Sequence, residues 1–109
     1  MFISIIFEVT IMKDFIKDEY IDLLCEAILS LKNTEEVHSF LCDVCSHAEL
    51  KAITQRLVVA KMLSEDCVYN KIIEETGAST ATISRVNKRL EHGADGYKTV
   101  LSRLAEKQV

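Results

Sequence analysis

The apolar residues of this chain recur mainly at steps of three and four positions, a spacing that is typical of amphipathic α-helices. The first such stretch covers 13–31, and its apolar positions are Phe15, Tyr20, Leu23, Leu24, Ala27, Ile28 and Leu31. We expect this helix to end near Lys32 or Asn33, because Asn33 or Thr34 can cap a second helix over 34–45. The apolar stripe of that second helix is Val37, Phe40, Leu41 and Val44.

Four further helices follow from the same kind of pattern. Ser46 with Glu49 three residues later matches a capping box, which predicts a helix over 48–65. Its apolar positions are Leu50, Ile53, Leu57, Val58, Ala60 and Leu63. Two short helices are predicted over 69–76 and 80–90, and a last one from about Gly96 or Tyr97 toward Lys107. With no proline in the chain to interrupt them, these stretches predict an all-α protein of about six helices.

The length and composition predict one domain. A chain of 109 residues with 49% hydrophobic residues can build one modest core, and we place this domain at 12–109. The first eleven residues are apolar, but they lack the basic region and cleavage site of a signal peptide and fall short of the roughly 20 residues of a membrane span. Because Met12 directly precedes an amphipathic helix, we interpret 1–11 as an extension outside the native chain. An edge strand or a segment packed in a dimer is the alternative.

The charge distribution limits the choice of partner. The net charge of −4 argues against nucleic acid, yet the excess of acids lies before residue 49, and no acid occurs between Ser79 and Leu90. A local basic face is therefore compatible with the total. Four cysteines without a secretory signal indicate free thiols in a reducing compartment, which predicts a cytoplasmic protein.

The segment "EETGASTATISRVNKRL" predicts a helix-turn-helix over about 68–90. Gly77 can adopt the left-handed conformation that ends the first helix, and Ser79 can cap the second, which leaves a turn of about three residues. The apolar residues expected to hold the two helices together are Ile72, Ile73, Ile83, Val86 and Leu90.

The opposite face of the second helix carries small hydroxyl groups and positive charge. Small side chains let a helix approach base edges, and basic residues bind phosphate. The free amides at the start of the helix also attract phosphate. We therefore predict a surface that contacts double-stranded DNA and consists of Ser79, Thr80, Ala81, Ser84, Arg85 and Lys88.

Two segments carry a resemblance to a known family. "AELKAITQRLVVAKML" and "YNKIIEETGASTATISRVNKRLEHGADGYKTVLSRL" resemble the Trp repressor-like YerC/YecD family, and the likeness covers about 12–104. It implies an intertwined homodimer of about six helices per chain that regulates transcription through its helix-turn-helix. It also implies that the helix from Ser79 onward is the recognition helix.

The better-known Trp repressor of this family binds tryptophan as a corepressor, and the resemblance allows its pocket to be located. Arg85 matches one of two ligand-binding arginines, and Thr82 matches a threonine near the indole. Gln55 falls where the second arginine would stand, with Arg56 one residue away, so we expect the pocket to lack a charge that the ligand needs.

Two further positions of that pocket depart from the family pattern. Val86 and Arg89 stand where the Trp repressor has a glycine and a serine. We expect these larger side chains to fill the pocket, so that DNA binding needs no tryptophan or other cofactor. The resulting remnant of a ligand pocket comprises Gln55, Thr82, Arg85, Val86 and Arg89.

Other functions are less well supported by the sequence. The cluster His38, Cys42, Cys45 and His47 contains zinc-ligand residue types, but no second pair follows at the spacing of a zinc finger, and we predict no metal site. No phosphate loop or nucleophile motif indicates an enzyme. The main rival to a DNA-binding regulator is a helical dimer that mediates protein interactions without binding DNA, which the negative net charge favours. No small-molecule effector can be named from the sequence.

Overall fold

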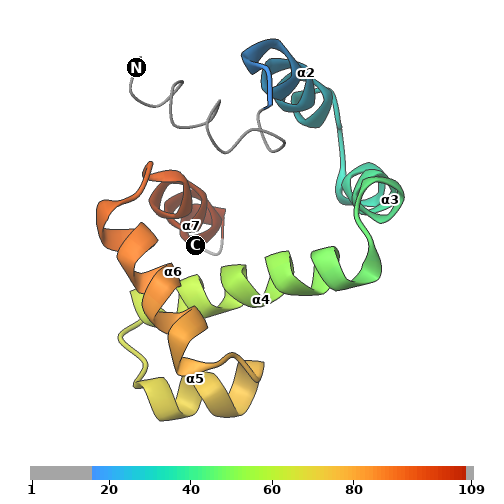
Figure 1. Ribbon diagram of the computed structural model, residues 1–109. Coiled ribbons are helices and arrows are strands. Elements are labelled where there is room, and N and C mark those ends of the chain that lie inside the picture. Colours follow the sequence, from blue (N-terminus) through green and yellow to red (C-terminus); the bar gives the residue numbers. More distant parts are fainter. Residues whose placement is uncertain (1–15, 108–109) are drawn as a thin grey trace. The chain divides into compact units, whose positions relative to one another are not determined.

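The computed structural model describes residues 16–107, which form six α-helices and contain no strand (Figure 1). The helices are α2 (Asp18–Leu29), α3 (Thr34–Val44), α4 (His47–Ser64), α5 (Tyr69–Thr76), α6 (Thr80–His92) and α7 (Gly96–Lys107). The predicted all-α class of about six helices is thus confirmed. The predicted extension 1–11 lies outside the described residues.

The chain divides near the end of α3 into two compact units, Met1–Asp43 and Val44–Val109. The first contains α2 and nearly all of α3, and the second contains α4 to α7. A single domain over 12–109 stays a prediction.

The first helix ends at Leu29, earlier than the predicted end near Lys32 or Asn33. The polar groups beyond Leu29 form local hydrogen bonds and do not continue the helix. The Ser30 hydroxyl donates to the Ala27 carbonyl at 2.6 Å. The Lys32 backbone N–H donates to the Glu36 carboxylate at 2.9 Å. Asn33 Oδ1 accepts from the Glu36 backbone N–H at 2.9 Å, so Asn33 is the cap of α3. Local side-chain bonds of this kind compete with helix continuation, which explains the early end.

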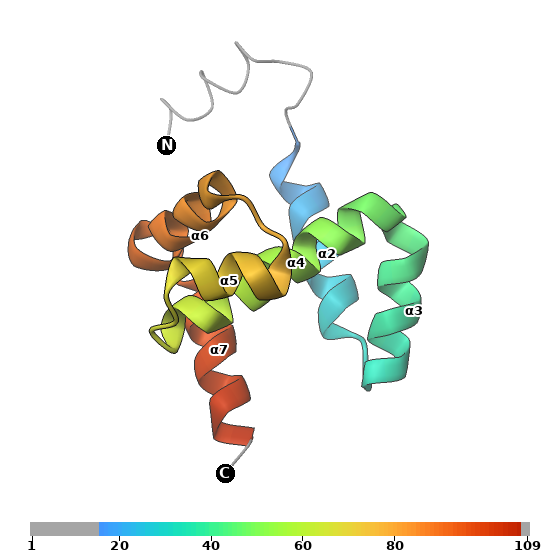
Figure 2. The ribbon, with the colours of Figure 1, turned by 90° about the horizontal axis from the view of Figure 1, so that it is seen from below.

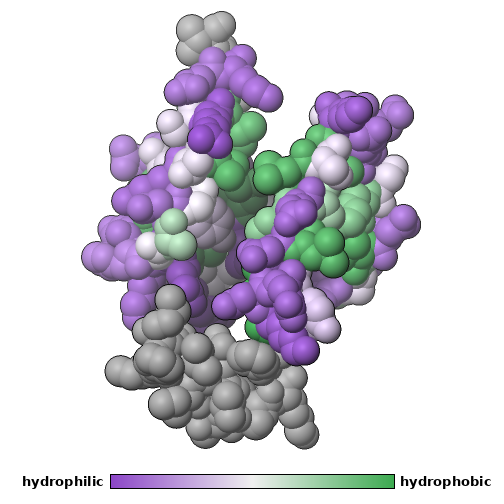
Figure 3. Space-filling view, turned by 90° about the horizontal axis from the view of Figure 1, so that it is seen from above, coloured by the Kyte–Doolittle hydropathy of each residue, from purple (hydrophilic) through white to green (hydrophobic). Residues whose placement is uncertain are grey.

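The apolar faces of α2 and α3 are largely exposed in the isolated chain, although Ala27, Phe40 and Leu41 are partly buried. Neither helix contains a buried residue, and Leu23 and Leu29 are 64% and 83% exposed. Figure 3 shows hydrophobic surface, in green, open to solvent between hydrophilic side chains. Short helices in water are marginal unless such a face is packed against another apolar surface.

The capping box that opens α4 is present as predicted. Ser46 Oγ accepts from the Glu49 backbone N–H at 3.1 Å, and the Ser46 backbone N–H donates to the Glu49 carboxylate at 2.8 Å. The Ser46 backbone N–H and, after it, the Ser46 side chain favour the ionised Glu49 carboxylate, so the pKa of Glu49 lies below its ordinary value of 4.5. The start of α4 is therefore stabilised by a negative charge.

Acid is expected to remove this stabilisation. Because the pKa of Glu49 is lower in the folded state, its contribution is fully present above about pH 4.5 and is lost as the pH falls through the lowered value. The variant Glu49→Gln should thus be less stable than the wild type at pH 7, and the difference should shrink below pH 4.5. Urea unfolding at a series of pH values measures this. A difference that does not change with pH would contradict it.

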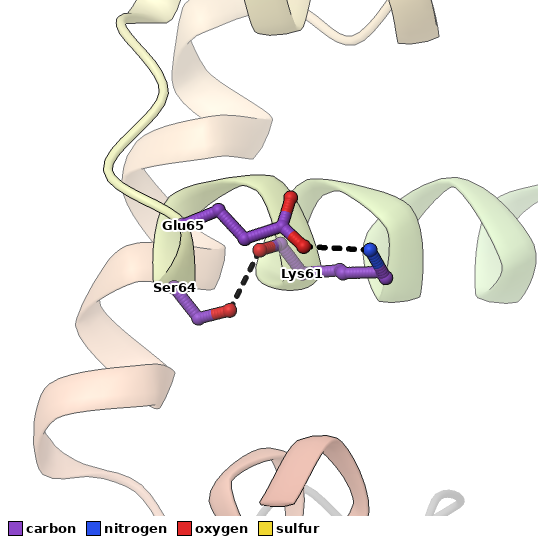
Figure 4. A network of polar contacts seen from close by, with 3 residues as sticks. All are labelled: Lys61, Ser64 and Glu65. Carbon is purple, nitrogen blue, oxygen red and sulfur yellow. Dashed lines mark hydrogen bonds and ion pairs between the residues drawn. The ribbon is translucent and has the colours of Figure 1, made fainter. Parts of the chain in front are cut away.

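The far end of α4 is closed by a small polar network (Figure 4). Lys61 Nζ pairs with the Glu65 carboxylate at 2.6 Å, and the Ser64 hydroxyl donates to the Lys61 carbonyl at 2.6 Å. Both charged side chains are about half exposed, so the ion pair contributes less than about 1 kcal/mol. Asp66 then adopts a left-handed conformation, with φ 61°, and reverses the chain toward α5.

The core of the second unit forms where α5, α6 and α7 contact α4 (Figures 1 and 2). Its buried residues are Val59, Ala60, Met62, Ile72, Ala78, Ile83 and Val86. Ile72, Ile83 and Val86 were predicted to join the two short helices, and they do so. Partly buried residues around this core include Ile73, Tyr97 and Leu101.

The predicted apolar face of α4 needs a correction. Ala60 is buried as expected, but Val59 and Met62, which were not predicted, complete the core. Ile53 is instead 44% exposed, and Leu57 and Val58 are also exposed. The helix is apolar on more than one side, so the sequence alone does not show which side faces its own chain.

Candidate nucleic-acid interface

A short turn joins α5 to α6, and local hydrogen bonds close it. Gly77 has the predicted left-handed conformation, with φ 72°, and its N–H donates to the Ile73 carbonyl at 2.8 Å. Ala78 is buried, and its N–H donates to the Thr76 hydroxyl at 3.1 Å. Ser79 Oγ then accepts from the Thr82 backbone N–H at 3.1 Å and caps α6, as predicted.

The conformation of Gly77 leads to a stability prediction. A Cβ at this position would meet no atom within 4 Å, so Gly77→Ala is expected to cost only the left-handed backbone penalty, about 1–2 kcal/mol. The matched control is Gly96→Ala, since Gly96 is helical, has no positive φ and has equally open space. Urea unfolding at one protein concentration should show a clear loss for Gly77→Ala and none for Gly96→Ala. Equal effects would contradict this account of the turn.

Gln55 ties the turn to the long helix α4. Its Nε2 group donates to the Thr76 carbonyl at the end of α5, at 3.0 Å, in a partly buried position. Orphan carbonyls at a helix end need such donors. From the sequence, Gln55 was expected only in a ligand pocket, and this role at the end of α5 was not predicted.

The two faces of α6 differ as expected for a helix-turn-helix. Ile83 and Val86 are buried in the core on one side. The six residues of the predicted DNA-contacting surface are all exposed: Ser79, Thr80, Ala81, Ser84, Arg85 and Lys88. Within residues 16–107, the ion pairs are Lys61–Glu65 and Lys98–Asp95, so neither Arg85 nor Lys88 is paired with a described acid.

One residue of this surface already has a local partner. The Ser79 hydroxyl accepts from the Thr82 N–H and also donates to Thr82 Oγ1 at 3.1 Å. The main role of the Ser79 hydroxyl is therefore to cap α6. The exposed side chains of Thr80, Ala81 and Ser84 leave the first turns of α6 accessible to a close partner.

A cavity of about 360 Å³ lies beside this surface, between α4, α6 and the start of α7. Its lining residues are Ala52, Gln55, Arg56, Thr82, Arg85, Val86, Arg89 and Tyr97. All five residues of the predicted pocket remnant come together here. Ala52, on α4, was missed, and so was Tyr97, because only the tertiary fold brings α7 to this place.

Two expectations about this pocket are wrong. The side chains of Val86 and Arg89 were expected to fill it, yet the space remains open. Val86 is 2% exposed and packed in the core, so it supplies a wall, and Arg89 is exposed. Gln55 was also expected to deprive the pocket of a charge, but the neighbouring Arg56 lines it as well. Gln55 and Arg56 are successive residues of α4, and the cavity is wide enough for both to line it.

Metal-ligand residue types do not gather in the described part of the chain. His38 Nδ1 and Cys42 Sγ are 3.9 Å apart on α3, but within residues 16–107 no three or more His, Cys, Asp or Glu side chains lie close enough together to hold a metal ion.

Within residues 16–107, no helix has the length and hydrophobicity needed to cross a membrane.

The turn, the buried and exposed faces of α6 and the packing on α4 define a helix-turn-helix protein. The Trp repressor protein family matches residues 19–105, and the chain belongs to this family. It is 47% identical over 93 residues to the uncharacterized protein YerC of Bacillus subtilis (strain 168), covering 85% of this chain and 89% of YerC. The predicted resemblance to the YerC-containing family is confirmed.

Two solved structures have the same fold. A TrpR-like protein from Eubacterium eligens is 50% identical, with a TM-score of 0.78, and the match covers 82% of this chain and 92% of that protein. A protein provisionally assigned as a Trp repressor, from Staphylococcus aureus, is 44% identical, also with a TM-score of 0.78, over 82% of this chain and 89% of its own. The relatives therefore match this chain along most of its length.

Proposed function

We propose that this protein is a cytoplasmic, sequence-specific DNA-binding regulator of transcription that acts as a homodimeric repressor. The observation that carries this proposal is the exposed face of α6. Small hydroxyl groups and two cations lie on it in a stretch without acids, while the opposite face is fixed in the core. Membership of the Trp repressor family supports the same function.

The chemistry of α6 suits the major groove of double-stranded DNA. Thr80 and Ser84 can exchange hydrogen bonds with base edges, and Ala81 can contact a thymine methyl group. Arg85 and Lys88 can bind phosphates, which supplies affinity and orientation. The buried residues Ile83 and Val86 hold this helix against α4, so little conformational entropy is lost when DNA binds.

Homodimer formation is supported by apolar surface that one chain leaves exposed. The helices α2 and α3 contain no buried residue. In the second unit, an open groove of about 550 Å³ between α4 and α7 is lined largely by apolar residues, among them Ile53, Leu57 and Val100. A second copy can cover such surfaces, and a two-fold dimer presents two recognition helices to two half-sites.

The rival function is a helical dimer that binds other proteins and not DNA, which the net charge of −4 favours. Fluorescence anisotropy with a labelled duplex, at low and at moderate salt, distinguishes the two. We expect binding that weakens steeply as salt rises, since released counterions drive it. Absence of binding at low salt would favour the interaction module.

DNA binding is expected not to require tryptophan. Three guanidinium groups and no acid line the cavity, so the ammonium group of L-tryptophan has no carboxylate to pair with there, and Gln55 is already bonded to Thr76. Calorimetry with L-tryptophan should give no heat above dilution, and millimolar L-tryptophan should leave the DNA affinity unchanged. A tenfold gain in affinity, about 1.4 kcal/mol of coupling, would contradict this prediction.

A further inference from the structure

Within the residues that the structure describes, Gln55 forms the only side-chain hydrogen bond that joins two helices. Its Nε2 group donates to the Thr76 carbonyl at 3.0 Å, across 21 positions of the chain. Every other side-chain hydrogen bond within residues 16–107 joins residues at most four positions apart, and the ion pairs there are equally local. A single side-chain hydrogen bond therefore ties α5 to α4.

The surroundings of Gln55 are open. It lines the cavity of about 360 Å³ between α4, α6 and the start of α7, and also a groove of about 550 Å³ between α4 and the end of α5. The buried residues of α4 are Val59, Ala60 and Met62, which begin about one helical turn after Gln55. At the level of Gln55, therefore, little apolar packing fixes α5 and α6 against α4.

The core and the hydrogen bond restrain different movements. Apolar packing opposes separation of the helices but has no preferred direction, whereas an N–H···O bond requires a short distance and a nearly linear angle. The bond from Gln55 to Thr76 therefore fixes how the end of α5 is oriented on α4. It also satisfies a carbonyl at a helix end, which would be costly to leave without a partner in a partly buried place.

Thr76 connects Gln55 with the turn and with α6. While its carbonyl accepts from Gln55, its hydroxyl accepts from the Ala78 N–H at 3.1 Å. Ser79 is the next residue, and its hydroxyl accepts from the Thr82 N–H in the first turn of α6. Hydrogen bonds between adjacent parts of the chain thus connect α4 with the start of α6.

We propose that Gln55 is a positioning residue for DNA recognition. It lies on α4, outside the DNA-contacting surface, and holds Thr80, Ala81 and Ser84 in the orientation that contacts with base edges need. Such contacts tolerate displacements of about 0.5 Å, whereas long cationic side chains reach phosphates from many orientations. Loss of the bond therefore reduces sequence-specific binding more than binding to arbitrary DNA. This inference rests on the proposed function of α6.

Two variants remove the donor without changing the net charge, namely Gln55→Met and Gln55→Leu. Because their side chains differ in shape, equal effects in both are due to the lost hydrogen bond. The matched control is Thr54→Val on the same helix, which loses only a local hydrogen bond from the Thr54 hydroxyl to the Leu50 carbonyl, at 2.8 Å. Urea unfolding of each full-length variant shows whether it is folded.

The first measurement is NMR relaxation dispersion of backbone amides without DNA. We expect exchange broadening on the microsecond-to-millisecond scale at amides 77–82 in both Gln55 variants, because the turn is no longer held in one orientation. The wild type and Thr54→Val should show none there. A merely destabilised protein keeps its native orientation in the folded fraction. Absence of any change at 77–82 in the Gln55 variants would overturn the positioning role.

The second measurement is the ratio of two affinities, for a duplex selected by the wild type and for a random-sequence duplex of equal length. We expect this ratio to fall about fivefold or more in both Gln55 variants and to stay within about twofold of the wild type in Thr54→Val. A loss of folded protein lowers both affinities equally and leaves the ratio unchanged. An unchanged ratio in the Gln55 variants would overturn the positioning role, even if the turn amides broaden.

The wild type separates this inference from the proposed function. If it binds neither duplex, or binds both equally, the function proposed for α6 fails, and the positioning role fails with it. If the wild type prefers its selected duplex and the Gln55 variants show the same preference, only the positioning role fails.

Discussion

Replacing both Arg85 and Lys88 by alanine is expected to weaken DNA binding about 100-fold and to reduce the slope of log affinity against log salt by about two. Each cation that binds a phosphate releases about one counterion, and each loses a charge-assisted hydrogen bond when truncated. Anisotropy titrations between about 50 and 200 mM salt measure both quantities.

The matched control for this double variant is Arg103→Ala combined with Lys107→Ala. These two cations are exposed on α7, outside the DNA-contacting surface of α6. The control loses the same net charge, so any difference between the two variants reports position and not total charge. Similar losses in both double variants would mean that DNA is bound by the general charge of the unit and not by α6.

The second large effect concerns the dimer. Leu24→Gln is expected to lower the stability of the folded dimer by about 2 kcal/mol or more per chain. Leu24 lies on α2, which has no buried residue in one chain although its side chains form an apolar stripe. If a second copy covers this stripe, the polar substitution removes buried apolar area from both halves of the interface.

Sedimentation velocity at micromolar concentration, with urea unfolding at several protein concentrations, measures this effect. The wild type should sediment as a dimer, and its unfolding midpoint should rise with concentration. Asp22→Gln is the control, because Asp22 is exposed and polar on the same helix. A wild-type chain that stays folded as a monomer would contradict the proposed dimer.

Local features of the fold could be predicted from the sequence because neighbouring residues determine them. Gly77 ends α5, while Ser79 caps α6 and Ser46 with Glu49 opens α4. In each of these places, the residue type has a specific backbone conformation or hydrogen bond to supply. The predicted end of α2 was less accurate, because Ser30 and Lys32 could either continue the helix or form hydrogen bonds with nearby groups.

The tertiary features were harder to predict. The helix α4 has apolar residues on several sides, so burial of Val59 and exposure of Ile53 depend on where α5 to α7 pack. The pocket was expected to be filled because side-chain size was compared position by position. Its open volume depends instead on side-chain direction, with Val86 held in the core, and on Tyr97 from a distant helix.

Selection from a library of random duplexes tests most directly whether α6 reads the sequence of DNA. The wild-type protein should enrich a motif with two related half-sites, as a two-fold dimer requires. The variant Thr80→Ala combined with Ser84→Ala should retain affinity for DNA but enrich a different or weaker motif, because hydroxyl contacts to base edges are lost. Enrichment of no motif by the wild type, or of the same motif by both proteins, would contradict the claim.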